Sequence, residues 1–146
     1  MVVFAKRILM AMIRFHQESK YMKLVVFNVG SALCVYAEHQ TTRIVFDIGK
    51  GNNFSPVNDF LLPLYEKRGE HRLKNRNNRY GISQLIVSHP HKDHISDIQE
   101  FDKNFYAHLL TTPNSKSPNG NPQNINWRKI TTPDDPDVKY LKRMKI

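Results

Sequence analysis

The sequence predicts a layered α/β or α+β domain built on one β-sheet. Short apolar runs rich in Val, Ile and Phe recur between residues 23 and 110, and such runs are typical of buried strands. Segments with helical spacing of apolar residues separate some of these runs, which favours alternation of strands and helices in layers. At 146 residues the chain has enough length for one small domain with a modest core.

The first part of the expected sheet consists of three strands. They cover residues 23–29, 32–37 and 42–46, with a Gly-Ser turn between the first two and Asp47 at the end of the third. A flexible loop at residues 49–53 follows. It lacks the Gly-Lys-Ser/Thr sequence of a phosphate-binding loop, so nucleotide binding through such a loop is not expected.

The second part alternates helices and strands. It is expected to contain a helix at residues 60–65 with Pro63 near its start, a strand at 82–87, a helix at 94–101 and a strand at 105–110. From residue 111 five prolines and five asparagines fall before the final segment, which predicts turns and irregular loop. Residues 138–146 are expected to form a short basic helix, with Asp137 as its cap.

The strand at 82–87 leads into a turn rich in metal-ligating side chains. It holds His89, His91, Asp93 and His94 within six positions, and imidazole nitrogen and carboxylate oxygen are ligands that zinc accepts. Side chains alternate on an extended segment, so the first two histidines point the same way. Pro90 disfavours the helical region for the residue before it and keeps that segment extended. The spacing therefore predicts a metal site, for which satisfied surface histidines are the alternative interpretation.

Together with two upstream segments, this turn resembles the metallo-β-lactamase fold family. The His-x-His-x-Asp-His run after an apolar strand is similar to the family's second motif. Residues 43–49, an apolar strand that ends in Asp47 and is followed closely by Gly49, resemble the first motif, and residues 23–30 resemble the opening strand. The local sequence is closest to the hydrolase domains of bacterial DNA-uptake (competence) proteins. Those domains usually carry Asp-Val-Gly-Gln-Gly-Asp where this chain has Asn-Val-Gly-Ser-Ala at 28–32.

The resemblance implies a four-layer αββα sandwich, of which this chain would hold only the N-terminal half. It implies that His89 and His91 ligate one zinc ion and that Asp93 and His94 ligate a second. Asp93 would also serve as a catalytic residue that manages the proton of the attacking water. Asp47 would orient the ligands through hydrogen bonds without binding metal. Because the family's later ligand motifs are absent from these 146 residues, the chain is expected to be truncated and a poor hydrolase on its own.

This interpretation divides the chain into three parts. Residues 1–21 are expected to be an N-terminal extension that takes no part in the fold, upstream of an alternative start at Met22. Residues 22–110 would form the half domain, and residues 111–146 a Pro/Asn-rich loop region with a short basic tail. The leading functional hypothesis is a zinc-dependent hydrolase that acts on phosphodiester or nucleic-acid substrates. The alternative is an inactive remnant that serves as a nucleic-acid or protein binding module. A lactam hydrolase is a third, less favoured hypothesis, because no export signal is visible.

The charge of the chain indicates an anionic partner. The net charge is +9, and basic residues crowd the segment 67–79, where Arg72, Lys74 and Arg76 are the candidates for nucleic-acid contacts. A solvated loop that keeps the protein soluble is the alternative. Exposed apolar surface on the sheet would favour self-association or pairing with a missing second half. A single cysteine and the lack of a long apolar run favour a cytoplasmic protein without an integral membrane segment.

Overall fold

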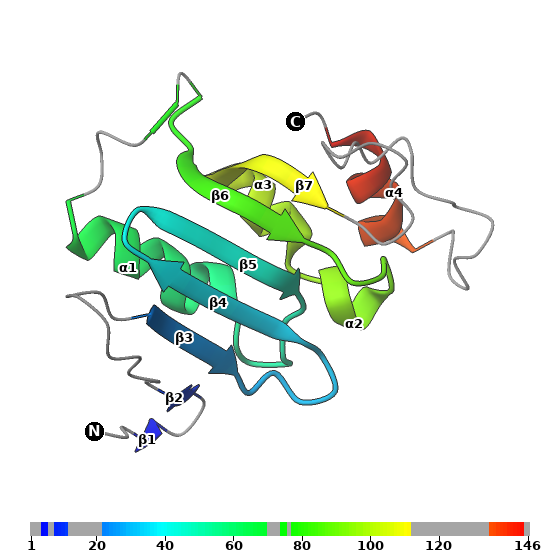
Figure 1. Cartoon of the computed structure of the whole chain (residues 1–146). Coiled ribbons are helices and arrows are strands. Elements are labelled where there is room, and N and C mark those ends of the chain that lie inside the picture. The colour runs from blue at the N-terminus through cyan, green and yellow to red at the C-terminus, as the bar shows by residue number, and fades with distance from the viewer. Residues whose placement is uncertain are drawn as a thin grey trace.

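The structure is a computed structural model that describes residues 4–5, 8–11, 22–69, 74–75, 77–111 and 135–144. These residues form a mixed α/β structure, in which one sheet lies against a layer of helices (Figure 1). The sheet has seven strands arranged in sequence order, from β1 at one edge to β7 at the other. The expected layering of strands and helices is confirmed at this coarse level.

The sheet is antiparallel in its first part and parallel in its last. Its strands are β1 (Phe4–Ala5), β2 (Ile8–Ala11), β3 (Met22–Phe27), β4 (Cys34–His39), β5 (Thr42–Ile48), β6 (Tyr80–Ile86) and β7 (Phe105–Thr111). Neighbours from β1 to β5 pair antiparallel, whereas β5, β6 and β7 run parallel. β2 pairs with β3. Part of residues 1–21 thus extends the sheet, which differs from the expectation that this stretch takes no part in the fold.

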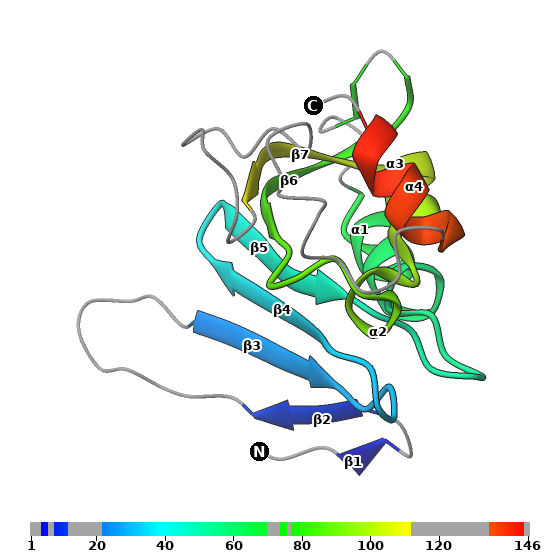
Figure 2. The ribbon, with the colours of Figure 1, turned by 90° about the vertical axis from the view of Figure 1, so that its right-hand side faces the viewer.

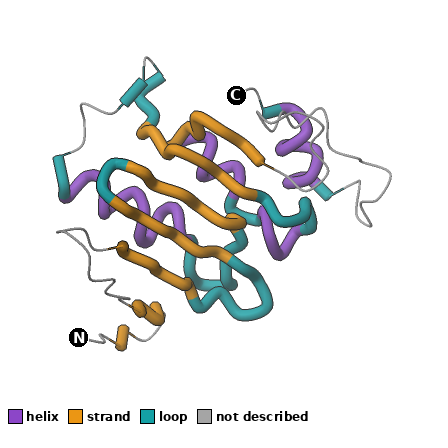
Figure 3. Tube along the Cα trace, viewed as in Figure 1, coloured by secondary structure: helices purple, strands orange, loops and turns teal. Residues whose placement is uncertain are grey.

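Helical segments supply the crossovers that parallel neighbours require. They are the π-helical turn η1 (Val57–Leu61), α1 (Leu62–Lys67), α2 (Lys92–Ile95), α3 (Ile98–Asn104) and α4 (Pro136–Arg143). η1 and α1 join β5 to β6, and α2 and α3 join β6 to β7 (Figure 3). α4 packs on α2 and α3. Within the part of the chain that the structure describes, none of the helices has both the length and the apolar character needed to cross a bilayer.

Two helices differ from the sequence expectation. The helix expected at residues 94–101 is two short helices, because the chain breaks at Ser96 and Asp97, where the Asp97 N–H donates to the carbonyl of Ile48 at 2.8 Å. The final helix begins at Pro136, and its cap is Asp135 rather than Asp137, because the Asp135 side chain accepts the N–H of residue 137. Proline at the first helical position suits this start, since its missing N–H has no helical partner there.

The core lies between the sheet and the helices. One row of side chains crosses five adjacent strands at paired positions and is fully buried: Val25, Tyr36, Val45, Leu85 and Leu110. Figure 2 shows the labelled helices on one side of the sheet. On β3, β4 and β5 the alternate positions face the other side, and they are also mainly apolar: Leu24, Val26, Val35, Ile44 and Phe46. Phe46 is 37 % exposed.

Candidate metal centre

The expected metal ligands follow the carboxyl end of β6, beside the carboxyl end of the parallel strand β5. β5 and β6 run parallel, so their carboxyl ends meet at the same edge of the sheet. Asp47 is the penultimate residue of β5, and Ser88 and His89 follow the end of β6. Ligands of open α/β sheets bind outside this edge, because the connecting loops leave a crevice there.

Asp47 organises the turn that follows β6. It is 1 % exposed, and its carboxylate accepts the Ser88 N–H at 2.7 Å and the Ser88 hydroxyl at 2.6 Å. Nδ1 of His94 lies 2.8 Å from the same carboxylate. The backbone of Asp47 has a φ of +52°, a left-handed conformation that Asp and Asn adopt more readily than other residues with a side chain.

The contact with Asp47 also fixes the tautomer of His94. A carboxylate can only accept, so Nδ1 of His94 carries the proton and donates it to Asp47. When the ring is neutral, Nε2 carries the lone pair, and this atom lies 3.4 Å from Oδ2 of Asp93. The ligand atoms of a tetrahedral zinc ion, each about 2.0–2.1 Å from the metal, lie about 3.3 Å apart. Asp93 and His94 therefore stand at the separation of two ligands of one ion.

His89 and His91 complete the cluster. One ligand atom from each of His89, His91 and Asp93 can be chosen so that all three lie within 4.8 Å of one another. The rings of His89 and His91 meet edge to face with centroids 4.7 Å apart, and the His89 and His94 rings lie 3.7 Å apart. The structure thus brings together all four residues of the sequence motif, and it places Asp93 against both the His89/His91 pair and His94. Two imidazoles and a carboxylate form a zinc donor set that leaves a fourth position open.

The environment of His89 favours the metal-binding form of its ring. Burial lowers the pKa of His89, and the neighbouring His94 and His91 rings lower it further, while Asp47 and Asp93 oppose the shift. A lowered pKa keeps the imidazole neutral, and the neutral ring is the form that ligates metals.

Backbone contacts hold the ligand-bearing helix α2 against two loops. The Leu33 N–H donates to the carbonyl of Asp93 at 3.1 Å, and the Gly49 N–H donates to the carbonyl of Leu33 at 2.9 Å. A Cβ placed on Gly49 would lie 2.0 Å from the Asp93 carbonyl oxygen and 2.8 Å from the Cβ of Ala32. No side chain fits at that distance, so the loop after β5 can approach α2 this closely only with glycine at position 49.

Asp97 anchors the other end of α2. It is 1 % exposed, and its Oδ2 accepts the Ser55 hydroxyl at 2.6 Å and the Val57 N–H at 3.1 Å. The Lys50 ammonium lies 3.9 Å from Oδ1, and that oxygen accepts no hydrogen bond from the described residues. Burial raises the pKa of Asp97, although these donors and Lys50 oppose the shift. Asp97 thereby ties the segment after the ligands to the start of η1.

Sequence reasoning missed two polar residues that support the cluster. Ser88 donates twice to Asp47 and also contacts the ring nitrogens of His89 and His94. Its place directly before the histidine-rich turn was a usable signal. Asp97 interrupts the apolar stripe that contains Ile95 and Ile98, and a buried carboxylate in such a stripe must find donors elsewhere in the fold.

Of the three candidates in the basic segment 67–79, only Lys74 belongs to the described residues, and it lies away from the histidines. Arg72 and Arg76 lie outside the described residues. Lys74 pairs with Tyr80 at the first residue of β6, and its ammonium lies 4.5 Å from the centre of that ring. The histidines follow the opposite end of β6, about 25 Å away at about 3.3 Å per residue. Lys74 therefore does not flank the cluster.

Comparison of the chain with protein-family models, with curated proteins and with solved structures found no match. The donor set at the ends of β5 and β6 fits a metal ion by residue type and by spacing. It offers two imidazole nitrogens and a carboxylate within 4.8 Å of one another. A third imidazole, that of His94, lies beside them, and its Nδ1 is hydrogen-bonded to the buried carboxylate of Asp47. Metal-ligating histidines are commonly oriented by such a carboxylate.

Proposed function

We propose that this chain is a metal-dependent hydrolase related to the metallo-β-lactamase fold family, with zinc held by His89, His91, Asp93 and His94. The observation that carries the proposal is the cluster itself, three ligand atoms within 4.8 Å at the carboxyl ends of parallel strands. The order of the sequence motifs, an apolar strand, then Asp47, then the histidine turn, supports the same family.

Some residues of the cluster would bind the metal ion, and others would orient the ligands. His89 and His91 would hold a metal ion together with Asp93, and His94 would share Asp93 with them. Asp47 would keep Nε2 of His94 directed at the ion through its bond to Nδ1. Zinc bound there would supply Lewis-acid catalysis and lower the pKa of a water molecule. Asp93, which is exposed, would accept a proton at its free carboxylate oxygen.

A phosphodiester is the substrate class that we propose. The net charge of +9 favours an anionic substrate, and the motif order resembles nucleic-acid hydrolases. Lys74 and the cluster are about 25 Å apart, which corresponds to about seven base-pair steps of a double helix at 3.4 Å each. A polynucleotide could therefore contact both regions at once.

Zinc content tests the proposal directly. Protein purified without chelator and then loaded with zinc should retain about one equivalent or more by elemental analysis. The double variant His89→Ala/His91→Ala should lose this metal. His39→Ala is the matched control, because His39 is an exposed histidine at the end of β4, outside the cluster. Equal zinc in the wild type and the double variant would refute the metal site.

A binding module without turnover is the second candidate function. His89, His91 and Asp93 offer three ligands for one ion. Among the described residues, His94 is the one further ligand beside Asp93. A second ion would thus have two protein ligands, fewer than the three that a catalytic zinc normally has. Hydrolysis of bis(p-nitrophenyl) phosphate separates the candidates. Turnover that is abolished by chelator and by His91→Ala supports the hydrolase, whereas zinc-loaded protein without turnover supports the binding module.

A further inference from the structure

Charged side chains gather at the end of the sheet that is remote from the candidate metal centre. Lys23, Glu38 and Arg43 occupy directly paired positions on three adjacent antiparallel strands. Arg68, at the carboxyl end of α1, reaches the same carboxylate. In Figure 1 the start of β3 and the end of α1 lie towards the left, whereas α2 lies towards the right. These four side chains are three cations and one carboxylate, so positive charge is in excess among them.

Both arginines bind the one carboxylate. Arg68 donates to both oxygens of Glu38, with 3.0 Å to Oε2, and Nε of Arg43 donates to Oε1 at 3.2 Å. The Arg43 guanidinium also lies over the ring of Tyr65, 4.8 Å from its centre. Burial alone would raise the pKa of Glu38, but the hydrogen bonds and charges of the two arginines lower it. The carboxylate opposite Lys23 is therefore ionised and already bound by two guanidinium groups.

The ammonium of Lys23 lies over aromatic rings. Its Nζ is 5.2 Å from the centre of the Phe60 ring and 6.0 Å from that of the fully buried Tyr36. Cation–π attraction extends to about 6 Å, so it is weak at these distances. Burial lowers the pKa of Lys23, and the charge of Arg68 lowers it further, while Glu38 opposes the shift. The neutral amine of Lys23 is thus more populated at a given pH than that of an ordinary lysine, and a neutral amine is a nucleophile.

An amine beside two guanidinium groups suits a small uncharged electrophile that becomes an anion when it reacts. Carbon dioxide has these properties. The amine nitrogen attacks its carbon, an N–C bond forms, one C–O π bond opens to a carboxylate oxygen, and the nitrogen gives a proton to water. The product is a carbamate with one negative charge. Acylation, in contrast, would leave Lys23 neutral and without a charge for the arginines to stabilise.

We propose that Lys23 takes up carbon dioxide at its side-chain amine and holds the resulting carbamate beside Arg43 and Arg68. The reaction replaces the excess cation by a second anion, so two guanidinium groups then face two negative groups. Charge-assisted hydrogen bonds of this kind are stronger than neutral ones. Carbon dioxide would thereby strengthen the link between β3 and the end of α1. The site requires no metal and does not depend on the proposed hydrolase.

The test uses the full chain in isotope-labelled bicarbonate at about pH 8.5, where most lysines stay protonated. A carbon NMR spectrum should show a carbamate signal that disappears in buffer free of carbon dioxide. Trapping with triethyloxonium, followed by peptide mass spectrometry, locates the modified lysine. Lys23 should be modified about fivefold or more over Lys103, whose side chain is 72 % exposed. Equal modification of these two lysines would overturn the proposal.

Two variants test the role of the cluster. Arg68→Gln removes a charge that lowers the pKa of Lys23 and that would face the carbamate. Modification of Lys23 should therefore fall about threefold or more in this variant. Lys67→Gln is the matched control, because Lys67 is an exposed cation one position earlier, and it should leave the modification unchanged. Equal modification in both variants contradicts the proposal.

Lys23→Arg keeps the positive charge and should abolish the carbamate signal, and a signal of unchanged size in this variant would assign the carbamate to another amine. The double variant His89→Ala/His91→Ala separates this site from the metal centre. It should lose zinc and still form the carbamate on Lys23. A carbamate that disappears together with zinc would overturn the assignment to Lys23.

Discussion

Three hydrogen bonds converge on one carboxylate, that of Asp47, and this convergence fixes the geometry of the candidate metal centre. Two of the donors are the backbone and hydroxyl of Ser88, and the third is the ring of His94. All three lie more than 40 positions along the chain from Asp47. The candidate metal ligands are close together in sequence, whereas Asp47 is brought to them by the parallel pairing of β5 and β6.

The variant Asp47→Asn isolates the orienting role of this carboxylate. Asparagine tolerates the φ of +52°, but its side chain has one acceptor oxygen in place of two. We expect zinc affinity to fall about 10-fold to 100-fold, because His94 loses its charged partner. Competition with a zinc chelator measures the affinity, and urea unfolding reports stability separately. Unchanged zinc affinity would show that Asp47 supports the fold without orienting the metal ligands.

Asp97 makes stability depend on pH with a definite sign. Burial raises the pKa of Asp97 above 3.8 in the folded protein. Between 3.8 and the higher folded pKa, the folded state binds more protons than the unfolded state, so the free energy of unfolding falls as pH rises. Asp97→Asn removes this dependence.

The wild-type free energy of unfolding, minus that of Asp97→Asn, should therefore decrease from about pH 3.5 towards neutral pH. Urea unfolding of both proteins across this range measures the difference. A difference that grows with pH would mean that the donors Ser55 and Val57 stabilise the carboxylate more than burial disfavours it.

At the scale of elements, the close contact between the loop after β5 and helix α2 sets the position of the candidate ligands on α2. Gly49 leaves no room for a Cβ, because the Asp93 carbonyl would lie 2.0 Å from it. We expect Gly49→Ala to push α2 away from the loop, to destabilise the fold by about 1–3 kcal/mol, and to lower zinc content.

Gly51→Ala is the matched control for this variant. A Cβ on Gly51 would lie 3.4 Å from the nearest atom of Val29, so Val29 would need to move only slightly to accommodate it. Elemental analysis and urea unfolding of the two alanine variants give the comparison. If both retain zinc equally, the spacing between the loop and α2 does not control the ligands.

The strands of the sheet could be predicted from sequence, but several connections between elements could not. Strands β3 to β7 were expected within a few residues of their observed bounds, because apolar runs and turn residues are local signals. The break between α2 and α3 depends on the bond from Asp97 to Ile48, a contact between distant segments. β2 escaped notice because Lys6 and Arg7 interrupt the apolar pattern before it.

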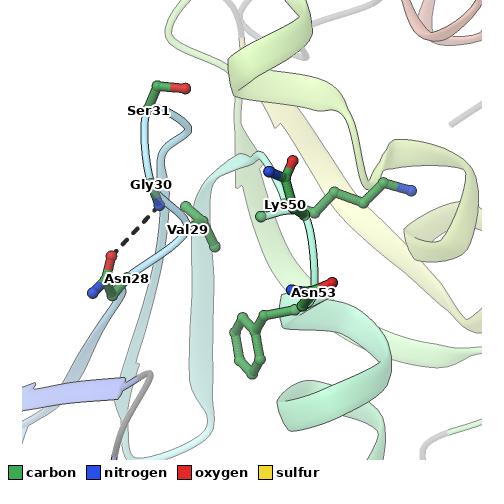
Figure 4. A pocket seen from close by; sticks show the side chains of 9 residues that line it. Asn28, Val29, Gly30, Ser31, Lys50 and Asn53 are labelled. Atoms are coloured by element: carbon green, nitrogen blue, oxygen red, sulfur yellow. Dashed lines mark hydrogen bonds between the residues drawn. The ribbon is translucent and has the colours of Figure 1, made fainter.

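The same division holds for the site. His89, His91, Asp93 and His94 could be found from spacing, because one strand and one helix start place them. The cavity of about 300 Å³ that residues 28–31 and 50–54 line (Figure 4) could not, since it combines two loops that no motif connects. The nucleic-acid role of Arg72, Lys74 and Arg76 stays a prediction.

At the scale of the whole molecule, the net charge of +9 predicts salt-dependent association with nucleic acid. Binding to a single-stranded oligonucleotide should weaken steeply as salt rises. Replacing Arg72, Lys74 and Arg76 with Ser should reduce the slope of log K against log salt by about 2 if all three contact phosphates, at about 0.7 each for single strands. Fluorescence anisotropy at several salt concentrations measures this slope.

The control for this experiment changes the same net charge elsewhere. This variant replaces three lysines outside the segment 67–79 with Ser: Lys103, Lys139 and Lys145. The slope of log K against log salt should then stay close to that of the wild type. Equal slopes for the two triple variants would show that the charge acts diffusely and that the segment 67–79 has no special role.

The sequential order of the strands has a consequence for how the molecule is made. Each strand pairs with the one that precedes it in the chain, so the sheet can grow by addition at one edge while the polypeptide leaves the ribosome. The antiparallel pairings of β3, β4 and β5 are local, whereas the parallel pairing of β5 with β6 joins distant residues such as Ile44 and Gln84, and pairings of the second kind form more slowly. The hairpin of β4 and β5 can therefore form before β6 joins the sheet, and the Asp47 carboxylate gains its bonds to Ser88 and His94 only when β6 is in place. Pulsed hydrogen exchange should accordingly protect amides of β4 before those of β6, and the reverse order would show that the histidine turn forms first and recruits the hairpin.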